Sequence, residues 1–205
     1  MFLVVGLGNP GRRYVHTRHN VGFKVIENLQ DRWQIQGESA QLGALVGNGM
    51  IASTRATLAR PQKFMNRSGH PVASIAGYYK LEEQDVIVVH DDVDLPFGQV
   101  RVKRGGGHGG HNGLRDIIKH LGREFPRVRV GVGRPPQGWD TADYVLGKWA
   151  ADEQAEVPHL VDTASNAVEA VLREGLEAAM NRFNTRPKAE KTAENNRASD
   201  RPGEQ

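Results

Sequence analysis

The chain has 205 residues, which fits one domain or one domain with a tail and is long enough to bury a substantial core. It has no cysteine, so disulfides, thiolate metal sites and a cysteine nucleophile are excluded together. No apolar run approaches the roughly 20 residues of a membrane span, and the N-terminus lacks the charged segment of a signal peptide. These features predict a cytoplasmic protein that does not contact a membrane.

Charge is distributed unevenly along the chain, although the net charge is only +3. Residues 1–135 carry a net charge of +8, and residues 136–184 carry a net charge of −6. A basic body beside an acidic segment suggests a face that binds a polyanion, whereas ordinary surface charge explains the totals at least as well. The charge alone leaves both interpretations open.

The first half of the chain alternates between predicted strands and helices. Residues 2–5 form an apolar run typical of a buried strand, and residues 20–33 have apolar side chains at helical spacing. Residues 41–60 contain two β-rich runs around Gly47-Asn48-Gly49, which predicts a hairpin that turns at this Asn-Gly pair. Residues 68–79 are expected to be helical.

The second half continues this alternation. The β-branched run 86–89 is typical of a central strand that is buried on both faces. From residue 185 on, the chain lacks aromatic and large aliphatic side chains, so we expect residues 185–205 to be a disordered polar tail. The other predicted elements are strands at 99–104 and 127–132, a helix at 113–121 that ends at Gly122, and helical residues 151–180 in two pieces around Pro158.

Together these elements predict an α/β fold, a single-domain three-layer sandwich over residues 1–184 with a twisted mixed sheet flanked by helices. Functional sites in such sheets lie at the C-terminal ends of the parallel strands. We therefore expect the loops after Val5, Val89 and Arg104 to meet at one site.

The loop after the first strand contains Gly6, Gly8 and Gly11, which have the G-x-G-x-x-G spacing of a dinucleotide-binding loop. Such a site needs a helix that starts at the third glycine and an acid at the end of a second strand about twenty residues later. Here the helix is predicted to begin well after that glycine, and the candidate acid, Asp31, falls within it. We expect the rigid Asn-Pro-Gly turn to fix the side chain of Asn9 at the mouth of the strand instead.

Three further segments carry polar groups that suit chemistry. His19 precedes a helix, where a histidine can exchange protons near neutral pH or simply cap the helix. The acidic segment 90–94 follows the buried strand and is suited to bind a metal, to orient a histidine or to form a solvated turn. Residues 105–113 are rich in glycine, as expected where backbone approaches a ligand, and Asn112 is a candidate N-cap for the next helix.

No side chain in the sequence is an evident covalent nucleophile. Ser68 lacks the G-x-S-x-G context, and cysteine is absent. A hydrolase built on this chain would activate water directly, which requires a general base, an orienting acid and amide groups around the acyl centre. Residues of these types are available at His19, Asp91, Asn9, Asn66 and Asn112.

Five segments form an ordered set, namely Gly6 to Gly11, Tyr14-x-x-Thr17-Arg18-His19-Asn20-x-Gly22, Phe64-Met65-Asn66-x-Ser68-Gly69, His90-Asp91-x-Val93-Asp94-Leu95 and Gly105 to Leu114. Their order and spacing resemble those of the bacterial peptidyl-tRNA hydrolase family. The resemblance covers residues 1–184 and leaves the tail outside. Because five ordered segments match, the resemblance is far more specific than any single glycine loop.

The resemblance implies an enzyme of translation that hydrolyses the ester between the peptide and the terminal ribose of peptidyl-tRNA. It implies that His19 is the general base for water and that Asp91 accepts a hydrogen bond from its imidazole, with no covalent intermediate, metal or cofactor. Asn9 would distinguish an N-blocked aminoacyl group from a free amine. Contacts to substrate and tRNA are implied for Tyr14, Phe64, Met65, Asn66, Asn112, Lys103 and Arg129.

The implied partner is peptidyl-tRNA, bound at its acceptor stem and 3′ end by a monomer. Lys103 and Arg129 match the positions with which the family holds tRNA phosphate, which agrees with the basic charge of residues 1–135 and predicts an affinity that falls with salt. The variable position of the acidic segment holds Asp92, which we expect to add negative charge near His19.

Three alternative functions make different predictions. A metal-dependent hydrolase would lose activity with a chelator. A non-catalytic RNA-binding module would bind tRNA without turnover, and a dinucleotide enzyme would bind its cofactor at the first glycine loop. The metal ligands of the first alternative would be His90, Asp91, Asp94, His108 and His111.

Overall fold

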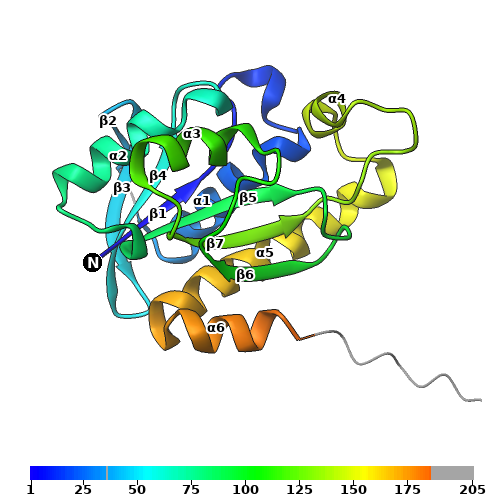
Figure 1. The fold of residues 1–205 in the computed structure, drawn as a ribbon. Coiled ribbons are helices and arrows are strands. Elements are labelled where there is room, and N and C mark those ends of the chain that lie inside the picture. The colour runs from blue at the N-terminus through cyan, green and yellow to red at the C-terminus, as the bar shows by residue number, and fades with distance from the viewer. Residues whose placement is uncertain (36, 186–205) are drawn as a thin grey trace, which may run out of the picture.

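The computed structural model describes residues 1–35 and 37–185 and contains a seven-stranded mixed sheet (Figure 1). The strands lie in the order β2-β3-β4-β1-β5-β7-β6. Strands β4, β1, β5 and β7 are parallel to one another, whereas β2, β3 and β6 run antiparallel to their neighbours. In chain order the strands are β1 (Phe2–Gly6), β2 (Ser39–Gln41), β3 (Ala44–Ile51), β4 (Thr54–Pro61), β5 (Val86–Asp92), β6 (Val100–Arg104) and β7 (Pro126–Gly131).

Helices cover both faces of this sheet, so the predicted three-layer α/β sandwich is confirmed (Figure 1). Helices α2 and α3 pack on one face, and α1, α5 and α6 pack on the other. No helix in the described part of the chain combines the length and the apolar character needed to cross a membrane. The helices are α1 (Val21–Arg32), α2 (Gly69–Tyr78), α3 (Asn112–Leu121), α4 (Thr141–Leu146), α5 (Ala151–Glu174) and α6 (Leu176–Phe183), with short 3-10 turns η1 (Arg12–Tyr14), η2 (Arg18–Asn20), η3 (Met65–Arg67) and η4 (Glu83–Asp85).

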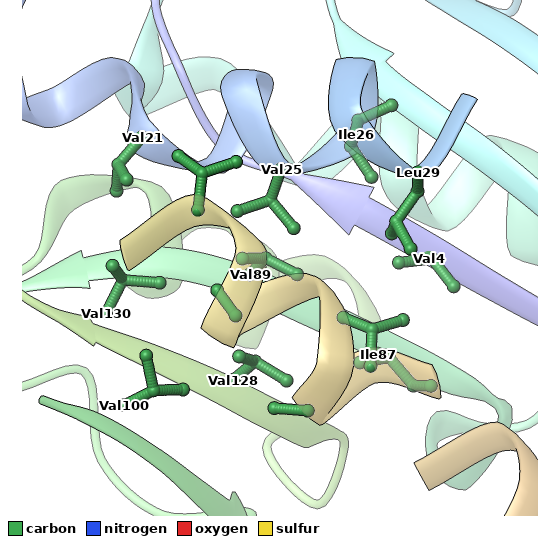
Figure 2. Close-up of a cluster of buried hydrophobic side chains, with 14 of the residues drawn as sticks. Val4, Val21, Val25, Ile26, Leu29, Ile87, Val89, Val100, Val128 and Val130 are labelled. Carbon is green, nitrogen blue, oxygen red and sulfur yellow. The ribbon is translucent and has the colours of Figure 1, made fainter. Parts of the chain in front are cut away.

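The central strand β5 is buried on both faces, as its β-branched run predicts. Ile87 and Val89 point into the core beneath α1 and α5, part of which Figure 2 shows. Val86 and Val88 point into the second core, beneath α2 and α3. Because successive strand residues point to opposite faces, one continuous apolar run supplies both cores.

Among the described residues, the core beneath α2 and α3 includes side chains of β3, β4, β1 and β5 but none of β6 or β7. On the same face, the neighbouring strands β7 and β6 carry Arg127, Arg129, Arg101 and Lys103. The residue between the two arginines of β7, Val128, belongs to the core on the opposite face. One face of β6 and β7 is therefore a basic surface, formed by Arg101, Lys103, Arg127 and Arg129.

The hairpin of β3 and β4 forms as expected, but the predicted position of its turn is wrong. Strand β3 runs through Gly47-Asn48-Gly49, and the two-residue turn lies at Ala52-Ser53, both with positive φ. A Cβ atom on Gly49 would lie 2.6 Å from Cγ1 of Ile35. Glycine is needed there because Ile35 packs closely against the strand, and not because the chain turns.

The predicted break of the C-terminal helical region at Pro158 is also wrong. Helix α5 runs through Pro158 for 24 residues, and the break falls at Gly175, which has a φ of 88°. A proline removes a single N–H donor from a long helix, whereas a left-handed residue cannot continue it. The predicted tail, apart from Thr185, lies outside the described residues.

Two of the three expected loops, those after Val5 and Val89, leave the same C-terminal edge of the parallel strands. The third does not, because β6 is antiparallel and Arg104 pairs with Pro126 at the opposite edge. Residues 105–111 cross back from there, so that α3 begins close to the end of β5. The loop after β4 also reaches the C-terminal edge, because β4 is parallel to β1.

Candidate active site

A pocket of about 630 Å³ extends from the C-terminal edge of the parallel strands over the basic surface of β6 and β7. Tyr14 is the one predicted site residue that does not line it. Tyr14 instead packs edge-to-face against Phe64, with ring centroids 6.4 Å apart. The other predicted site residues all line the pocket, namely Asn9, His19, Phe64, Met65, Asn66, Asp91, Lys103, Asn112 and Arg129.

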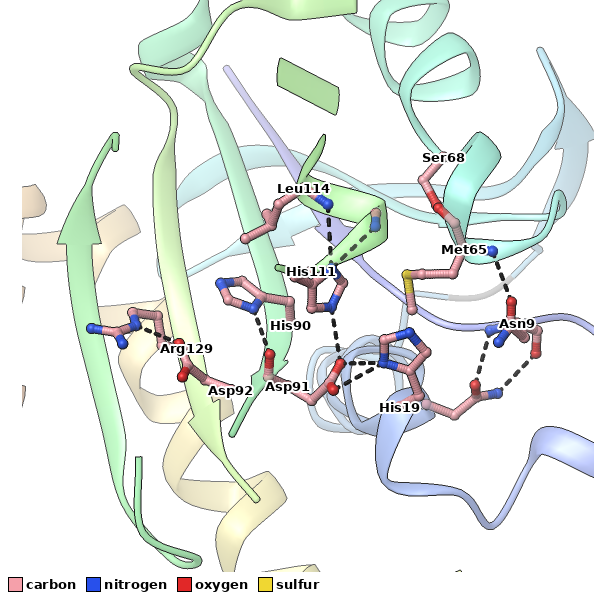
Figure 3. Close-up of polar contacts among 12 residues, drawn as sticks. Asn9, His19, Met65, Ser68, His90, Asp91, Asp92, His111, Leu114 and Arg129 are labelled. Carbon is pink, nitrogen blue, oxygen red and sulfur yellow. Dashed lines mark hydrogen bonds and ion pairs between the residues drawn. The ribbon is translucent and has the colours of Figure 1, made fainter. Parts of the chain in front are cut away.

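His19 and Asp91 form a buried hydrogen-bonded pair in this pocket (Figure 3). Nδ1 of His19 lies 2.8 and 2.9 Å from the two carboxylate oxygens of Asp91. The two residues are 8% and 3% exposed. An ionised carboxylate only accepts hydrogen bonds, so Nδ1 of His19 carries a hydrogen, and in the neutral ring the lone pair lies on Nε2. The turn η2 places His19 directly before α1, and Asp91 lies at the end of β5.

A second imidazole, that of His111, holds the same carboxylate. Its Nε2 lies 3.0 Å from Oδ1 of Asp91, and its Nδ1 accepts the backbone N–H groups of Gly113 and Leu114 (Figure 3). A nitrogen that accepts hydrogen bonds carries no hydrogen, so Nε2 is the donor to Asp91 and the ring is neutral. His111 is therefore the N-cap of α3, and the prediction that Asn112 has this place is wrong.

The two imidazoles keep Asp91 ionised. Burial would raise the pKa of Asp91, but the proximity of His19 and His111 and their hydrogen bonds outweigh burial, so the pKa lies well below its usual range. A carboxylate in this state stabilises positive charge on a neighbouring imidazole. The pair can therefore accept a proton at His19 without neutralising Asp91.

The loop after β1 fixes Asn9 in the wall of the pocket. The backbone N–H of Met65 donates to Oδ1 of Asn9 at 2.7 Å. The side chain of Asn20 bonds both the backbone N–H and the carbonyl of Asn9, each at 2.9 Å. Because the N–H of Met65 needs an oxygen acceptor, the amide orientation of Asn9 is defined, and Nδ2 is the atom left for a ligand.

The structural context of a dinucleotide loop is missing. Helix α1 begins at Val21, well after the third glycine, and Asp31 lies within that helix and not at the end of a strand. A Cβ atom on Gly8 would lie 2.7 Å from the ring of Phe23. The glycine spacing therefore allows α1 to pack closely on the loop that carries Asn9.

The expectation that Asp92 adds negative charge beside His19 is wrong, because Asp92 pairs with Arg129. Its Oδ2 accepts a hydrogen bond from Nε of Arg129 at 2.7 Å, because alternate residues of β5 point to opposite faces (Figure 3). Burial would raise the pKa of Asp92, but the hydrogen bond and the charge of Arg129, the neighbouring His90 and the backbone N–H of Asp94 together outweigh burial, so the pKa lies below its usual value. Asp92 therefore stays ionised, and the positive charge of Arg129 compensates its negative charge on the basic surface.

Arg18 is a buried residue next to His19 that belongs to the segment from Tyr14 to Gly22, but the sequence predicted no role for it. Its guanidinium lies 2.6 Å from Glu153 and is centred 4.3 Å from the ring of Tyr144. Its backbone N–H donates to the carbonyl of Gly147 at 3.1 Å. These contacts attach α4 and the start of α5 to the turn that carries His19. They join residues more than a hundred positions apart, so no local signal could have revealed them.

The five residues of the metal alternative do not form one cluster. Within the described ranges, the group whose ligand atoms converge is His19, Asp91 and His111, with these atoms within 4.8 Å of one another. In that group the imidazoles already hydrogen-bond the carboxylate. His90 bonds the backbone carbonyl of Asp91 at 2.7 Å, and His108 accepts a backbone N–H of the glycine loop at 3.0 Å.

Comparison with known proteins identifies the family. Residues 3–192 match the family model described as peptidyl-tRNA hydrolase. The chain belongs to the peptidyl-tRNA hydrolase family. The chain is therefore similar to hydrolases, as its five sequence segments indicated, and the match continues past residue 184 into the segment predicted as a tail.

Relatives match over almost the full length. The chain is 46% identical to the peptidyl-tRNA hydrolase of Roseiflexus sp. (strain RS-1), covering 98% of this chain and 94% of the relative. It is 51% identical to that of Frankia alni, covering 89% and 93%. A crystal structure of peptidyl-tRNA hydrolase from Acinetobacter baumannii is 38% identical and superposes with a TM-score of 0.84, covering 90% of this chain and 94% of that one. These matches support the prediction that the chain is an enzyme.

Proposed function

We propose that this enzyme hydrolyses the ester bond between the peptide and the terminal ribose of peptidyl-tRNA in the cytoplasm, and so releases tRNA for reuse in translation. The observation that carries the proposal is the buried His19–Asp91 pair in a pocket that asparagine side chains also line. Family membership supports the substrate. The lack of cysteine supports direct attack by water.

In the proposed reaction, Nε2 of His19 takes a proton from water while the water oxygen bonds to the ester carbon. The carbonyl electron pair moves onto its oxygen, which gives a tetrahedral intermediate. Asp91 stabilises the imidazolium during this step. When the intermediate collapses, the bond to the ribose oxygen breaks and the imidazolium returns its proton to that oxygen. An ester needs less leaving-group assistance than an amide, so one base suffices.

Amide side chains recognise the peptide in this proposal. Asn9, Asn66 and Asn112 line the pocket, and an amide both donates to carbonyls and accepts from N–H groups. Contacts of this kind read the peptide backbone and not its side chains, which suits an enzyme that accepts any nascent peptide. Nδ2 of Asn9 recognises the carbonyl of the N-blocking group. Phe64, which is 52% exposed, adds an apolar surface beside Tyr14.

Lys103 and Arg129 bind phosphate of the tRNA acceptor stem in this proposal. Both lie on the basic surface of β6 and β7, at the end of the pocket away from Asn9. Each phosphate contact should make the affinity fall with salt, because binding releases counterions. Every proposed site residue comes from one chain, so a monomer is sufficient for the reaction.

The test compares tRNA release from N-acetyl-aminoacyl-tRNA with release from the same tRNA carrying a free amine. Parent protein, His19→Ala and His16→Ala are assayed with a chelator present. His16 is an exposed histidine three residues from His19 and serves as the matched control. We expect rapid cleavage of the blocked substrate alone by the parent and by His16→Ala, and loss of cleavage in His19→Ala.

Other outcomes separate the alternatives. Loss of parent activity with chelator would favour the metal-dependent hydrolase. Binding of tRNA by the parent without any turnover would favour the RNA-binding module. Equal cleavage of both substrates would support the hydrolase activity but contradict the proposed recognition of the N-blocking group by Asn9.

A further inference from the structure

Arg127 is a buried cation that, within residues 1–35 and 37–185, forms no ion pair with a carboxylate. It is the second residue of β7 and is 3% exposed. Its Nη1 donates to the carbonyl of Gly107 at 2.6 Å, and its Nη2 donates to the carbonyls of Gly106 and Arg123. Burying a guanidinium is costly unless its donors are satisfied, and these converging carbonyls satisfy both terminal nitrogens, whereas the buried Nε has no hydrogen-bond partner among the described residues.

Arg127 differs in this respect from Arg129, although both line the same pocket. The side chain of Arg129 is 25% exposed, and within the described part of the chain it hydrogen-bonds Asp92 through Nε alone, which leaves its terminal nitrogens for a ligand. Both terminal nitrogens of Arg127 are occupied by backbone carbonyls. Burial and the neighbouring Arg129 also lower the pKa of Arg127, as expected for a cation shielded from solvent. Arg127 is therefore poorly placed to bind a phosphate.

The glycine loop that Arg127 holds leads directly to the catalytic pair. Gly105 and Gly106 have φ values of 53° and 106°, so the backbone at this point needs glycine and has many alternative conformations. The loop ends at His111, whose ring caps α3 and donates to Asp91. Displacement of the loop carbonyls would therefore move His111 away from Asp91.

We infer that Arg127 is a positioning residue, which fixes the glycine loop through its carbonyls and so keeps His111 against Asp91 and Asn112 in the pocket. The expected effect on turnover rests on the function proposed above, whereas the effect on the loop does not. A lysine cannot replace Arg127, because a single ammonium lacks the rigid fork that reaches several carbonyls at once.

The test uses Arg127→Lys, which keeps the charge, beside Arg129→Gln and the exposed control Arg123→Gln, whose side chain is 71% exposed. In Arg127→Lys we expect backbone amide hydrogen exchange of residues 105–111 to rise about tenfold or more and kcat per folded molecule to fall about tenfold. The dependence of tRNA affinity on salt should be unchanged. In Arg129→Gln the slope of log K against log salt should fall by about one, with loop exchange unchanged. Arg123→Gln should match the parent.

Two results would overturn the inference. One is a fall of about one in the salt slope of a further variant, Arg127→Gln, which removes the charge, together with unchanged loop exchange in Arg127→Lys; this would make Arg127 a phosphate ligand. The other is parental loop exchange and parental kcat in Arg127→Lys. If Arg127→Lys fails to fold, ¹⁵N NMR of the parent protein provides the test. The guanidinium hydrogens of Arg127 should exchange with water far more slowly than those of the exposed Arg134. Equal exchange would contradict the inference. If the parent has no hydrolase activity, the proposed function fails, and the exchange measurements still decide the role of Arg127.

Discussion

Asp91 accepts hydrogen bonds from two imidazoles, and the bonds of each ring decide which of them can act as a base. His111 uses both ring nitrogens, one toward Asp91 and one toward backbone N–H groups. Protonation of His111 would therefore break its cap on α3. Among the described residues, His19 forms side-chain hydrogen bonds only through Nδ1, so its Nε2 can take a proton at no cost in hydrogen bonds. Counting donors and acceptors thus favours His19 over His111 as the base of the proposed reaction.

The substitution Asp91→Asn tests this arrangement. An amide offers one acceptor oxygen, for which the N–H groups of His19 and His111 would compete, and its NH₂ group would face the other imidazole. We expect kcat to fall by about 10³- to 10⁴-fold, because the base loses its fixed tautomer, while tRNA affinity stays within about twofold. Single-turnover hydrolysis and filter binding measure the two quantities. A loss of kcat below about tenfold would be incompatible with this role.

The substitution Asn9→Asp separates recognition from folding. Aspartate keeps the oxygen that accepts the N–H of Met65 but replaces the free Nδ2 donor by a second acceptor. We expect kcat/KM for N-acetyl-aminoacyl-tRNA to fall about 100-fold or more, since the carboxylate repels a carbonyl oxygen, with Tm within about 3 °C of the parent. Steady-state kinetics and thermal melting provide the measurements. Unchanged kcat/KM would remove Asn9 from substrate recognition.

At the scale of the residue, a contact can be predicted from the sequence only where both residues lie in segments with a recognisable pattern. His19, Asp91 and Asn9 lie in segments whose composition is unusual, so their convergence could be anticipated. The roles of Arg18 and Arg127 could not, because each depends on backbone carbonyls or side chains that the fold brings from distant positions.

At the scale of the element, apolar periodicity predicts the central strands well, since burial on one or both faces determines their composition. Turn positions are harder to predict, because glycine and proline serve packing as well as turns. Gly49 lies within β3, where Ile35 packs against it, and Pro158 lies within α5. The direction of β6 was not predictable from its own residues, so the expected path of the glycine loop was wrong.

Helix α1 packs closely against β5 and the residue that follows β1, and this contact can be tested by substitution. A Cβ atom on Gly22 would lie 2.6 Å from the carbonyl oxygens of both Leu7 and Val89, and these backbone atoms cannot move freely. We expect Gly22→Ala to lower the free energy of unfolding by about 3 kcal/mol and to reduce activity, because α1 follows directly from the turn that carries His19. Urea unfolding measures the change.

Gly77 provides the matched control for that substitution. It lies near the end of α2, and a Cβ atom there would meet nothing within 4 Å. Gly77→Ala should therefore raise the free energy of unfolding by roughly 0.5–1 kcal/mol, the usual gain in helix propensity. Equal effects of the two substitutions on the free energy of unfolding would show that helix propensity, and not the contact with Leu7 and Val89, decides the effect at Gly22.

At the scale of the whole molecule, the basic and acidic segments of the sequence lie on opposite sides of the sheet. The basic surface of β6 and β7 lies on the α3 side of the sheet, whereas α5 and α6, which carry most acids of residues 136–184, lie on the other side (Figure 1). A molecule with opposite charges on its two faces orients toward a polyanion before contact. The sequence totals could not distinguish this from ordinary surface charge, because strand alternation and topology decide which face each residue joins.

The pH dependence of folding offers a test of the buried centre as a whole. Burial lowers the pKa of His90 to about 3, although Asp92 and Asp91 act in the opposite direction. The folded protein therefore keeps His90 neutral between its ordinary value near 6.5 and about 3, while the unfolded chain binds a proton there. Because the unfolded state then binds more protons, the free energy of unfolding falls as the pH falls through this range.

The expected size is about 1 kcal/mol for each pH unit below 6.5. The variant His90→Asn keeps an amide where Nδ1 of His90 bonds the carbonyl of Asp91 but does not titrate, so its stability should change less between pH 7 and pH 5. Asp91 does not interfere in this window, because its lowered pKa supplies stability that is lost only below the ordinary carboxyl range. Urea unfolding of both proteins at pH 7, 6 and 5 measures the two slopes. Identical slopes for the two proteins would mean that His90 takes up its proton in the folded state in this pH range. Burial would then not keep the ring neutral.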